Sequence, residues 1–296
     1  MNEFEFLLLD RLQKIRSINE QYDLEKNAYV SFSGGKDSTV LHYLIDEALP
    51  NNKIPRLFLN TGIEYKMIVQ FVKRCAENDS RIYIYNSRVN IIEMLKKKGY
   101  PFKSKEHSQK VYGYKNGWRN ESTLQYFGML PNGYNICPKK LLCQIEANYP
   151  LKISDSCCHE LKKKPAEKWA KENNKTIRLT GMRKEEGGER TTLNCIVLKD
   201  NSLVKFHPLA VVNEKWIDEY VHERNIKLCE LYYPPYNFKR TGCKGCPFSL
   251  GLENGLLIME NLLPAERKQC EMIWKPVYDE YRRLNYRLHS YPLLDE

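Results

Sequence analysis

The sequence has no apolar run approaching the roughly 18 residues that a membrane-spanning helix needs. Its first residues, 1–5, carry neither a basic segment nor a cleavage site of the kind that directs secretion. Internal repeats and low-complexity tracts are also missing. Disorder is excluded by the composition, which is 42% hydrophobic and 11% aromatic. We therefore expect a soluble, cytoplasmic protein.

Acidic residues are in the minority, since 47 Lys and Arg face 37 Asp and Glu and give a net charge of +10. This balance favours an anionic partner such as a nucleotide or a nucleic acid. Ten cysteines are many for a cytoplasmic chain of 296 residues. Because disulfides are rare in that compartment, we expect the cysteines to serve metal binding or catalysis.

Short apolar strands alternate with helical periodicity along much of the chain, which is typical of an α/β fold with a parallel twisted sheet and helices on both faces. Residues 1–240 are predicted to form this domain, with a basic insertion at about 100–150. Residues 241–296 are predicted to form a Cys-x-x-Cys knuckle and a helical tail. The expected strands are 28–32, 56–60, 81–85 and 176–180, and the expected helices are 4–18, 39–48, 64–78, 159–173 and 262–284.

A glycine pair stands between the first expected strand and the helix that follows it. Gly34 and Gly35 let the backbone curl and point N–H groups at an anion, and the helix N-terminus adds partial positive charge. The segment Ser33–Thr39 is therefore predicted to bind phosphate. The Gly-x-x-x-x-Gly-Lys-Ser/Thr spacing of kinases and GTPases is absent. A plain capped Gly-Gly turn is the alternative.

Residues 30–38 resemble the PP-loop of the adenine nucleotide α-hydrolase superfamily, whose members cleave ATP between the α and β phosphates to adenylate a substrate. The resemblance implies that the loop holds pyrophosphate, with Lys36 compensating its charge and the hydroxyls of Ser33 and Ser38 assisting. Mg²⁺ is expected to bridge the phosphates. Asp37 is expected to contact the metal or, with slight preference, to cap the helix.

Other segments resemble one branch of that superfamily, the phosphoadenosine phosphosulfate (PAPS) reductase family. Residues 59–64 are similar to its adenosine-pocket segment, and residues 207–220 to its Pro-Leu segment and the next helix. The first of these implies a cofactor-binding role for Asn60, Thr61 and Gly62.

Residues 180–190 resemble the Gly-x-Arg-x-x-Glu-x-x-x-Arg segment of the same family, which begins here at Gly181. Arg183 and Arg190 suit bidentate contacts with phosphate or sulfate oxygens. We expect both guanidinium groups to converge on one anion. The predicted catalytic residues are Lys36, Asp37, Arg183 and Arg190.

Two cysteine pairs are separated by 84 intervening residues, Cys157-Cys158 and Cys243-Lys244-Gly245-Cys246. Four thiolates suffice for a tetrahedral Zn²⁺ or an iron-sulfur cluster, although adjacent ligands suit zinc poorly. The pattern resembles that of the adenylylsulfate reductase subgroup, which implies a 4Fe-4S cluster. Zinc and unligated core cysteines remain the alternatives. Lys162, Lys163 and Lys164 would either offset the cluster's negative charge or form the solvated face of the next helix, and the solvated face is the preferred interpretation for most of them.

Two departures from the reductase pattern bear on the activity. The sequence lacks the Glu-Cys-Gly-(Ile or Leu)-His motif whose thiolate attacks the sulfonucleotide, and it keeps Lys36, which reductase loops typically lack. We therefore expect an ATP pyrophosphatase that adenylates a substrate and transfers sulfur to it. The expected acceptor is nucleic acid, either transfer RNA or DNA, since the Lys- and Tyr-rich residues 102–119 suit backbone contacts and base stacking. A solvated loop would explain that composition equally well.

The alternatives are a thioredoxin-dependent sulfonucleotide reductase and a non-catalytic nucleotide or cluster sensor. A reductase would need a relocated nucleophile such as Cys137 or Cys143, whose pKa the neighbouring lysines would lower; a buried or idle cysteine is the simpler interpretation. A cysteine desulfurase is a further candidate partner. The sequence does not predict an oligomeric state.

Overall fold

The computed structural model describes residues 2–131, 133–187 and 190–289, which form two compact units. Unit 1 comprises Met1–Ser87 and Lys164–Gly242, and unit 2 comprises Arg88–Lys163 and Cys243–Glu296. The predicted insertion thus groups with the C-terminal segment. The division at residue 240 inferred from the sequence stays a prediction.

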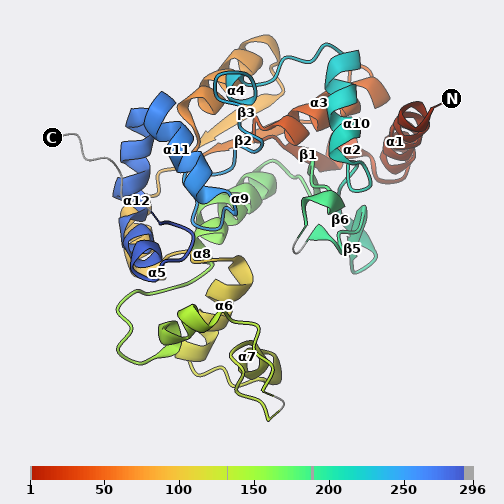
Figure 1. Ribbon diagram of the computed structural model, residues 1–296. Helices are drawn as coiled ribbons and strands as arrows, with labels where there is room; N and C mark the ends of the chain where they lie inside the picture. Colours follow the sequence, from red (N-terminus) through yellow and green to blue (C-terminus); the bar gives the residue numbers. More distant parts are fainter. Residues whose placement is uncertain (1, 132, 188–189, 290–296) are drawn as a thin grey trace. The chain divides into compact units, whose positions relative to one another are not determined.

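Unit 1 is built on a six-stranded sheet in the order β3-β2-β1-β4-β6-β5 (Figure 1). All neighbours pair in parallel except β5, which is antiparallel to β6. The predicted α/β fold with a largely parallel sheet is confirmed, while the β5–β6 hairpin was not foreseen. The strands are β1 (Ala28–Ser31), β2 (Arg56–Asn60), β3 (Ile82–Asn86), β4 (Ile177–Leu179), β5 (Ile196–Lys199) and β6 (Ser202–Phe206).

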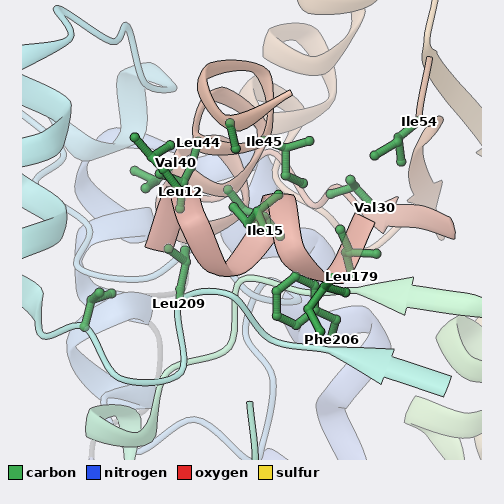
Figure 2. Packing of buried hydrophobic residues seen from close by; sticks show 14 of the residues in the cluster. Leu12, Ile15, Val30, Val40, Leu44, Ile45, Ile54, Leu179, Phe206 and Leu209 are labelled. Atoms are coloured by element: carbon green, nitrogen blue, oxygen red, sulfur yellow. The ribbon is translucent and has the colours of Figure 1, made fainter. Parts of the chain in front are cut away.

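Successive side chains of β1 point to opposite faces of the sheet. Ala28 and Val30 join a large core with apolar residues of α1, α3 and α10 (Figure 2). Tyr29 packs instead in a smaller cluster with Trp169 of α9, 5.6 Å between ring centroids. Helices therefore cover both faces. The helices of unit 1 are α1 (Glu3–Tyr22), α2 (Leu24–Asn27), α3 (Lys36–Ala48), α4 (Lys66–Asn78), α9 (Lys164–Glu172) and α10 (Glu214–Glu223).

The strand order reverses direction at β1. From β1 the chain proceeds through β2 to β3 on one side, whereas β4 and β6 lie on the other side. The loops that leave the carboxyl ends of β1 and β4 are therefore neighbours. In open parallel sheets this reversal is where ligands bind.

Unit 2 is largely helical. The insertion predicted at about 100–150 contains two helices that were not predicted, α6 and α7. Ser104 and Asn120 cap these helices by accepting hydrogen bonds from the amides of His107 and Thr123. Because α6 buries few apolar side chains, its periodicity is weak in the sequence. The elements are α5 (Ile91–Lys98), α6 (Lys105–Lys115), α7 (Glu121–Tyr126), the 3₁₀ helix η1 (Lys139–Ile145), α8 (Ser156–Cys158), the π-helical turn η2 (His159–Lys163), α11 (Leu252–Leu262) and α12 (Pro264–Arg283).

Within the described ranges, every helix is too short or too polar to span a bilayer.

Candidate functional site

The loop after β1 brings two hydroxyl groups together at the N-terminus of α3. The Oγ atoms of Ser33 and Ser38 lie 3.0 Å apart, and Ser38 Oγ donates to the Gly35 carbonyl at 2.9 Å. Gly34 has a φ of +70°, and a Cβ on it would lie 2.7 Å from Val72 Cγ2. Glycine is therefore required at this position by both backbone conformation and space.

Asp37 does not cap α3. Gly35 occupies the cap position without any side-chain bond, and Asp37 Oδ1 instead accepts a hydrogen bond from Arg183 Nε at 2.8 Å. The preferred capping role is thus wrong, since Arg183 reaches the carboxylate from the loop after β4. Thr39 is buried and donates its hydroxyl proton to the Gly35 carbonyl. Its predicted cofactor contact stays a prediction.

Two cations at the loop are paired with carboxylates of α10. Lys36 Nζ contacts Glu214 and, at 2.7 Å, Asp218, while Arg183 also contacts Glu214. Burial disfavours the charge of Lys36, but the hydrogen bonds to Asp218 and Glu214 outweigh it and raise the pKa of Lys36. Burial likewise opposes the charge of Glu214, but Lys36 and Arg183 together lower its pKa.

The loop after β4 passes directly against the start of α3. A Cβ on Gly181 would lie 2.7 Å from the Asp37 carbonyl oxygen, so glycine here permits a close backbone approach. Arg183 is 2% exposed, whereas Arg190 is half-buried in the turn beyond it. The predicted convergence of both arginines on one anion stays a prediction.

Tyr232 is a residue at this site that sequence reasoning missed. Its hydroxyl accepts a hydrogen bond from the Lys36 backbone N–H at 2.9 Å and lies 2.7 Å from Thr241 Oγ1. Burial raises the pKa of Tyr232. An amide that the loop would offer to a phosphate oxygen is therefore held by a neutral phenol.

A cavity of about 610 Å³ in unit 1 opens beside these groups. Its walls combine charged residues of the loop and of α10 with aromatic and basic residues of the segment 228–240. Among the residues that line it are Lys36, Asp37, Arg183, Glu214, Asp218 and Tyr232. Arg190 does not line it.

The predicted adenosine segment forms a tight turn after β2. The buried Glu64 carboxylate accepts hydrogen bonds from the Thr61 amide, at 2.8 Å, and from its hydroxyl, at 2.9 Å. Gly62 has a φ of +86°, which suits glycine. Asn60 Nδ2 donates to Asn86 Oδ1 at 2.9 Å. The turn is preformed, and the adenosine contacts of these residues stay a prediction.

A second charged cluster lies nearer the other end of α3, beside a further cavity of about 790 Å³ in unit 1. Its members are Arg56, Arg81, Asp46, Asp79 and His42. Among the residues that the structure describes, His42, Asp46 and Asp79 are the only group of three with ligand atoms within 4.8 Å of one another. Because Arg56 and Arg81 already neutralise both carboxylates, this cluster is an ion-pair network and does not suit a cation.

The four predicted cysteine ligands come together in unit 2. Cys157 is hydrogen-bonded to Cys158 and is within electrostatic range of Cys243 and Cys246. That hydrogen bond, together with Lys105, Lys162 and Lys163, lowers the pKa of Cys158 to about 6. Lysines thus flank the sulfurs, including Lys105, which sequence reasoning had not connected with them.

The knuckle Cys243–Cys246 is held on α12 by three aromatic side chains. Trp274 Nε1 donates to the Lys244 carbonyl at 3.1 Å, Tyr278 to the Gly245 carbonyl, and Tyr281 to the Pro247 carbonyl at 2.8 Å. Gly245 has a φ of +60°, and a Cβ there would lie 2.7 Å from Cys270 Sγ. The chain makes a tight turn here, and side chains from outside the motif fix it.

The donor set of four thiols fits a thiolate-ligated metal group. Cys157 lies within electrostatic range of the other three cysteines. Four thiolates suffice for a tetrahedral Zn²⁺ or for an iron-sulfur cluster. The choice of the cluster over zinc stays a prediction.

The thiols of the predicted insertion are not activated. Burial raises the pKa of Cys137 to about 11, against an opposing effect of Lys103. Burial also raises the pKa of Cys143. The idea that neighbouring lysines lower these pKa values is therefore wrong, because desolvation outweighs them.

Comparison with curated proteins gives a partial match. The chain is 32% identical over 103 residues to the uncharacterized protein MJ0973 of Methanocaldococcus jannaschii. This match covers 32% of the chain and only 25% of that protein.

Solved structures resemble the chain more broadly but at low identity. The phosphate complex of PAPS reductase from Candida auris is 16% identical, with a TM-score of 0.46, over 82% of this chain and 96% of that one. FMN adenylyltransferase from Candida glabrata in complex with ATP is 15% identical, with a TM-score of 0.45, over 82% and 63%. The NH3-dependent NAD synthetase from Campylobacter jejuni is 12% identical, with a TM-score of 0.45, over 100% of both chains.

A sequence model matches residues 27–248, which include the loop after β1, the loop after β4, α10 and the Cys-x-x-Cys knuckle. It describes the phosphoadenosine phosphosulfate reductase domain. The match spans well over half of the chain, and the chain therefore belongs to the phosphoadenosine phosphosulfate reductase domain family.

Proposed function

We propose that this protein is an ATP pyrophosphatase that adenylates an acceptor and then transfers sulfur to it, with a 4Fe-4S cluster held by Cys157, Cys158, Cys243 and Cys246. The acceptor we propose is nucleic acid. The observation that carries the proposal is the charged network at the loop, in which Lys36 and Arg183 stand beside the two loop hydroxyls and one cavity.

The network supports binding of pyrophosphate together with a divalent cation. Two cations face four carboxylates, those of Asp37, Glu185, Glu214 and Asp218. A polyphosphate that took over Lys36 and Arg183 would leave these carboxylates uncompensated. Carboxylate and phosphate oxygens are the ligands that Mg²⁺ prefers, so the site fits one Mg²⁺ bound by acidic residues and substrate phosphates. When bound, the metal would neutralise charge on the leaving pyrophosphate.

In the proposed reaction an acceptor oxygen forms a bond to the α phosphorus of ATP, and the bond to the bridging oxygen breaks to release pyrophosphate. A sulfur nucleophile then displaces AMP and leaves sulfur in place of that oxygen. Lys36 and the loop hydroxyls would hold the leaving pyrophosphate, and Arg183 would orient it. Positioning and charge neutralisation supply most of the rate enhancement in such transfers.

The cysteine cluster supports the second half of the reaction. Its four sulfurs and the flanking lysines suit a thiolate-ligated cluster, whose negative charge Lys105 and Lys162 would offset. When bound, the cluster would supply electrons or sulfur to the transfer step. A cysteine desulfurase is the proposed source of that sulfur.

A sulfonucleotide reductase is the main alternative, and the family assignment favours it. It would need a nucleophilic thiolate, and Cys137, with its pKa raised to about 11, does not provide one. A reductase would consume thioredoxin and no ATP. A nucleotide sensor would bind ATP without releasing pyrophosphate.

The test is pyrophosphate release from ATP by anaerobically purified full-length protein, with and without bulk transfer RNA or DNA. We expect release that nucleic acid stimulates, and a loss of about 100- to 1,000-fold in Lys36→Ala, because one preorganised charge at the leaving group is removed. Lys215→Ala removes an exposed lysine from α10 and is the matched control, with unchanged release.

Equal release by Lys36→Ala would contradict the assignment. Absence of release with sulfite formation from a sulfonucleotide would establish the reductase instead. Iron and sulfide analysis of Cys243→Ser tests the cluster separately. Retention of full iron content would remove Cys243 from the ligands, and stoichiometric zinc in the unmodified protein would replace the cluster by a zinc site.

A further inference from the structure

The indole of Trp118 lies against Gly113 near the end of α6 in unit 2. A Cβ on Gly113 would lie 2.2 Å from Trp118 Cε3 and 2.6 Å from Cδ2, so the ring covers the glycine. The Trp118 amide donates to the Gly113 carbonyl at 2.8 Å, which folds the chain back over the helix. Even so, Trp118 remains 43% exposed. The protein thus fixes a large aromatic ring in place and leaves its outer side in solvent.

A second planar group is fixed at the next residue. The Arg119 guanidinium stacks 3.9 Å from the centre of the Tyr114 ring and donates to the carbonyls of Tyr114 and Trp118 at 2.8 and 2.9 Å. Tyr114 is itself packed edge-on against Phe127, 5.5 Å between centroids. A stacked guanidinium presents positive charge beside the indole with little conformational freedom left to lose on binding.

Positive charge concentrates in the same part of the chain. Residues 88–163 contain 14 Lys and Arg against 6 Asp and Glu, so this segment accounts for +8 of the net charge of +10. Lys110 lies one helical turn before Gly113, on the same side of α6, and contacts Ser122 Oγ at 2.6 Å. Lys115 is exposed on the last turn of that helix. Exposed aromatic rings in such surroundings favour a partner that is both flat and anionic.

We propose that Lys110, Gly113, Tyr114, Trp118 and Arg119, here called the Trp118 platform, bind a single-stranded segment of nucleic acid. One base would stack on the indole, and the lysine and arginine would contact the flanking phosphates. A duplex is disfavoured because its bases already stack on one another. Gly113 is a positioning residue, since only a residue without Cβ lets the indole rest there.

This proposal deepens the proposed function, on which it rests, by naming where the acceptor strand binds. It can be tested without turnover, so the two can fail separately. Strand binding without any pyrophosphate release would overturn the function and leave the platform standing. Stimulation of pyrophosphate release by nucleic acid that is unchanged in Trp118→Ala would overturn the platform and leave the function standing.

The experiment is fluorescence anisotropy of labelled oligo(U) and oligo(dT), each about 16 nucleotides long, titrated with the full-length protein at several salt concentrations. We expect Trp118→Ala to weaken binding by about 5- to 100-fold, as loss of one stacked base does, and Trp118→Phe to retain most of the affinity. Gly113→Ala is expected to approach the Trp118→Ala result although it removes no ring and no charge. Arg119→Gln is expected to lower the slope of log affinity against log salt by about 1.

Tyr83→Ala is the matched control, because it removes an aromatic ring of similar exposure, 47%, from unit 1. Its affinity should equal that of the unmodified protein. Thermal melts of each variant check that it is folded. The proposal is overturned if Trp118→Ala binds as tightly as the control, if a blunt duplex binds as well as the single strands, or if an acidic peptide competes equally, which would indicate a protein partner. Tighter binding of oligo(U) or of oligo(dT) identifies RNA or DNA as the strand.

Discussion

Helix α3 connects two charged networks that differ in balance and in exposure. In the network at its N-terminus, two cations face four carboxylates, and Glu214 and Asp218 are 46% and 61% exposed. In the network nearer its C-terminal end, Arg56 and Arg81 face two carboxylates, and Arg56 is fully buried. The first network can exchange partners with a ligand, while the second is closed and serves stability.

Neutral groups also accept hydrogen bonds from Arg56 in the buried network. Arg56 donates to Asp46 Oδ1 at 2.6 Å, to Asn52 Oδ1 at 2.8 Å and to His42 Nδ1 at 3.1 Å. Arg81 holds both oxygens of Asp46, at 2.8 and 2.9 Å. A ligand would have to break several charge-assisted hydrogen bonds to reach these groups. The cavity next to the network is therefore a poor site for binding a charged ligand.

The largest expected effect is the loss of stability when the buried network is broken. Arg56→Leu should lower the free energy of unfolding by about 3–5 kcal/mol, because it leaves the Asp46 carboxylate partly buried without its closest cation. Urea unfolding followed by circular dichroism measures this. Arg74→Leu breaks an exposed pair with Glu230, 51% and 50% exposed, and should cost no more than about 1 kcal/mol. Equal losses in the two variants would contradict the distinction.

The second prediction concerns acid stability. Burial lowers the pKa of His42 to about 4, with Arg56 adding to the effect. The unfolded chain, with a histidine pKa of about 6.5, then takes up the proton first as the pH falls. Stability is therefore complete above pH 6.5 and declines by about 3 kcal/mol between pH 6.5 and pH 4 on account of this residue. Asp46 and Asp79, whose pKa values lie below normal, add their loss of stability only below about pH 4.

Unfolding free energies measured from pH 7 to pH 4 test this dependence. His42→Gln keeps an acceptor for Arg56 and should flatten the decline, whereas His222→Asn, at an 88% exposed side chain, should leave it unchanged. An identical slope in the His42 variant would show that the residue does not stay neutral in the folded protein.

The smallest expected effect is a change in ATP affinity when the exposed network loses one carboxylate. Glu214→Gln removes a carboxylate that competes with phosphate for Lys36 and Arg183. Without Mg²⁺, ATP affinity should rise by about two- to fivefold, the value of a partly exposed ion pair. With Mg²⁺ the gain should shrink or reverse, because the lost carboxylate also serves the metal. Isothermal titration calorimetry measures both, with Glu219→Gln as the control; a gain that is the same with and without Mg²⁺ would contradict a metal role.

The sequence was sufficient for the parts of the fold that local pattern determines. The strand predicted at 56–60 matches β2, and the loop at Ser33–Thr39 joins a strand to a helix as expected. Helices α6 and α7 were not predicted, although their capping residues are local signals, because their buried faces are small and give weak hydrophobic periodicity. The β5–β6 hairpin was missed as well.

At the loop after β1, the sequence predicted the cations and the two hydroxyl groups but not the groups that pair with the cations. Lys36 and Arg183 belong to motifs, but the groups that hold them are remote in sequence: Glu214 lies 178 residues from Lys36, and Tyr232 lies 196 residues from it. No local periodicity encodes such contacts. Glu214 and Asp218 are four residues apart on α10, which was the one available signal that both carboxylates share a helix face. The prediction that Asp37 caps α3 was wrong for the same reason, since its partner Arg183 is 146 residues away in the sequence.

The hydroxyl of Tyr232 accepts the hydrogen bond of the Lys36 amide, so an anion that binds this amide must displace the hydroxyl. Because this oxygen already occupies the Lys36 amide, an incoming anion replaces one hydrogen bond by another at that atom and gains little there. An anion that reaches only this amide is therefore a poor competitor. A chain of phosphates that also reaches Lys36 Nζ, Arg183 and the two loop hydroxyls gains at several points at once. If the proposed function holds, the phenol would act as an internal competitor that discriminates against small anions and favours polyphosphates.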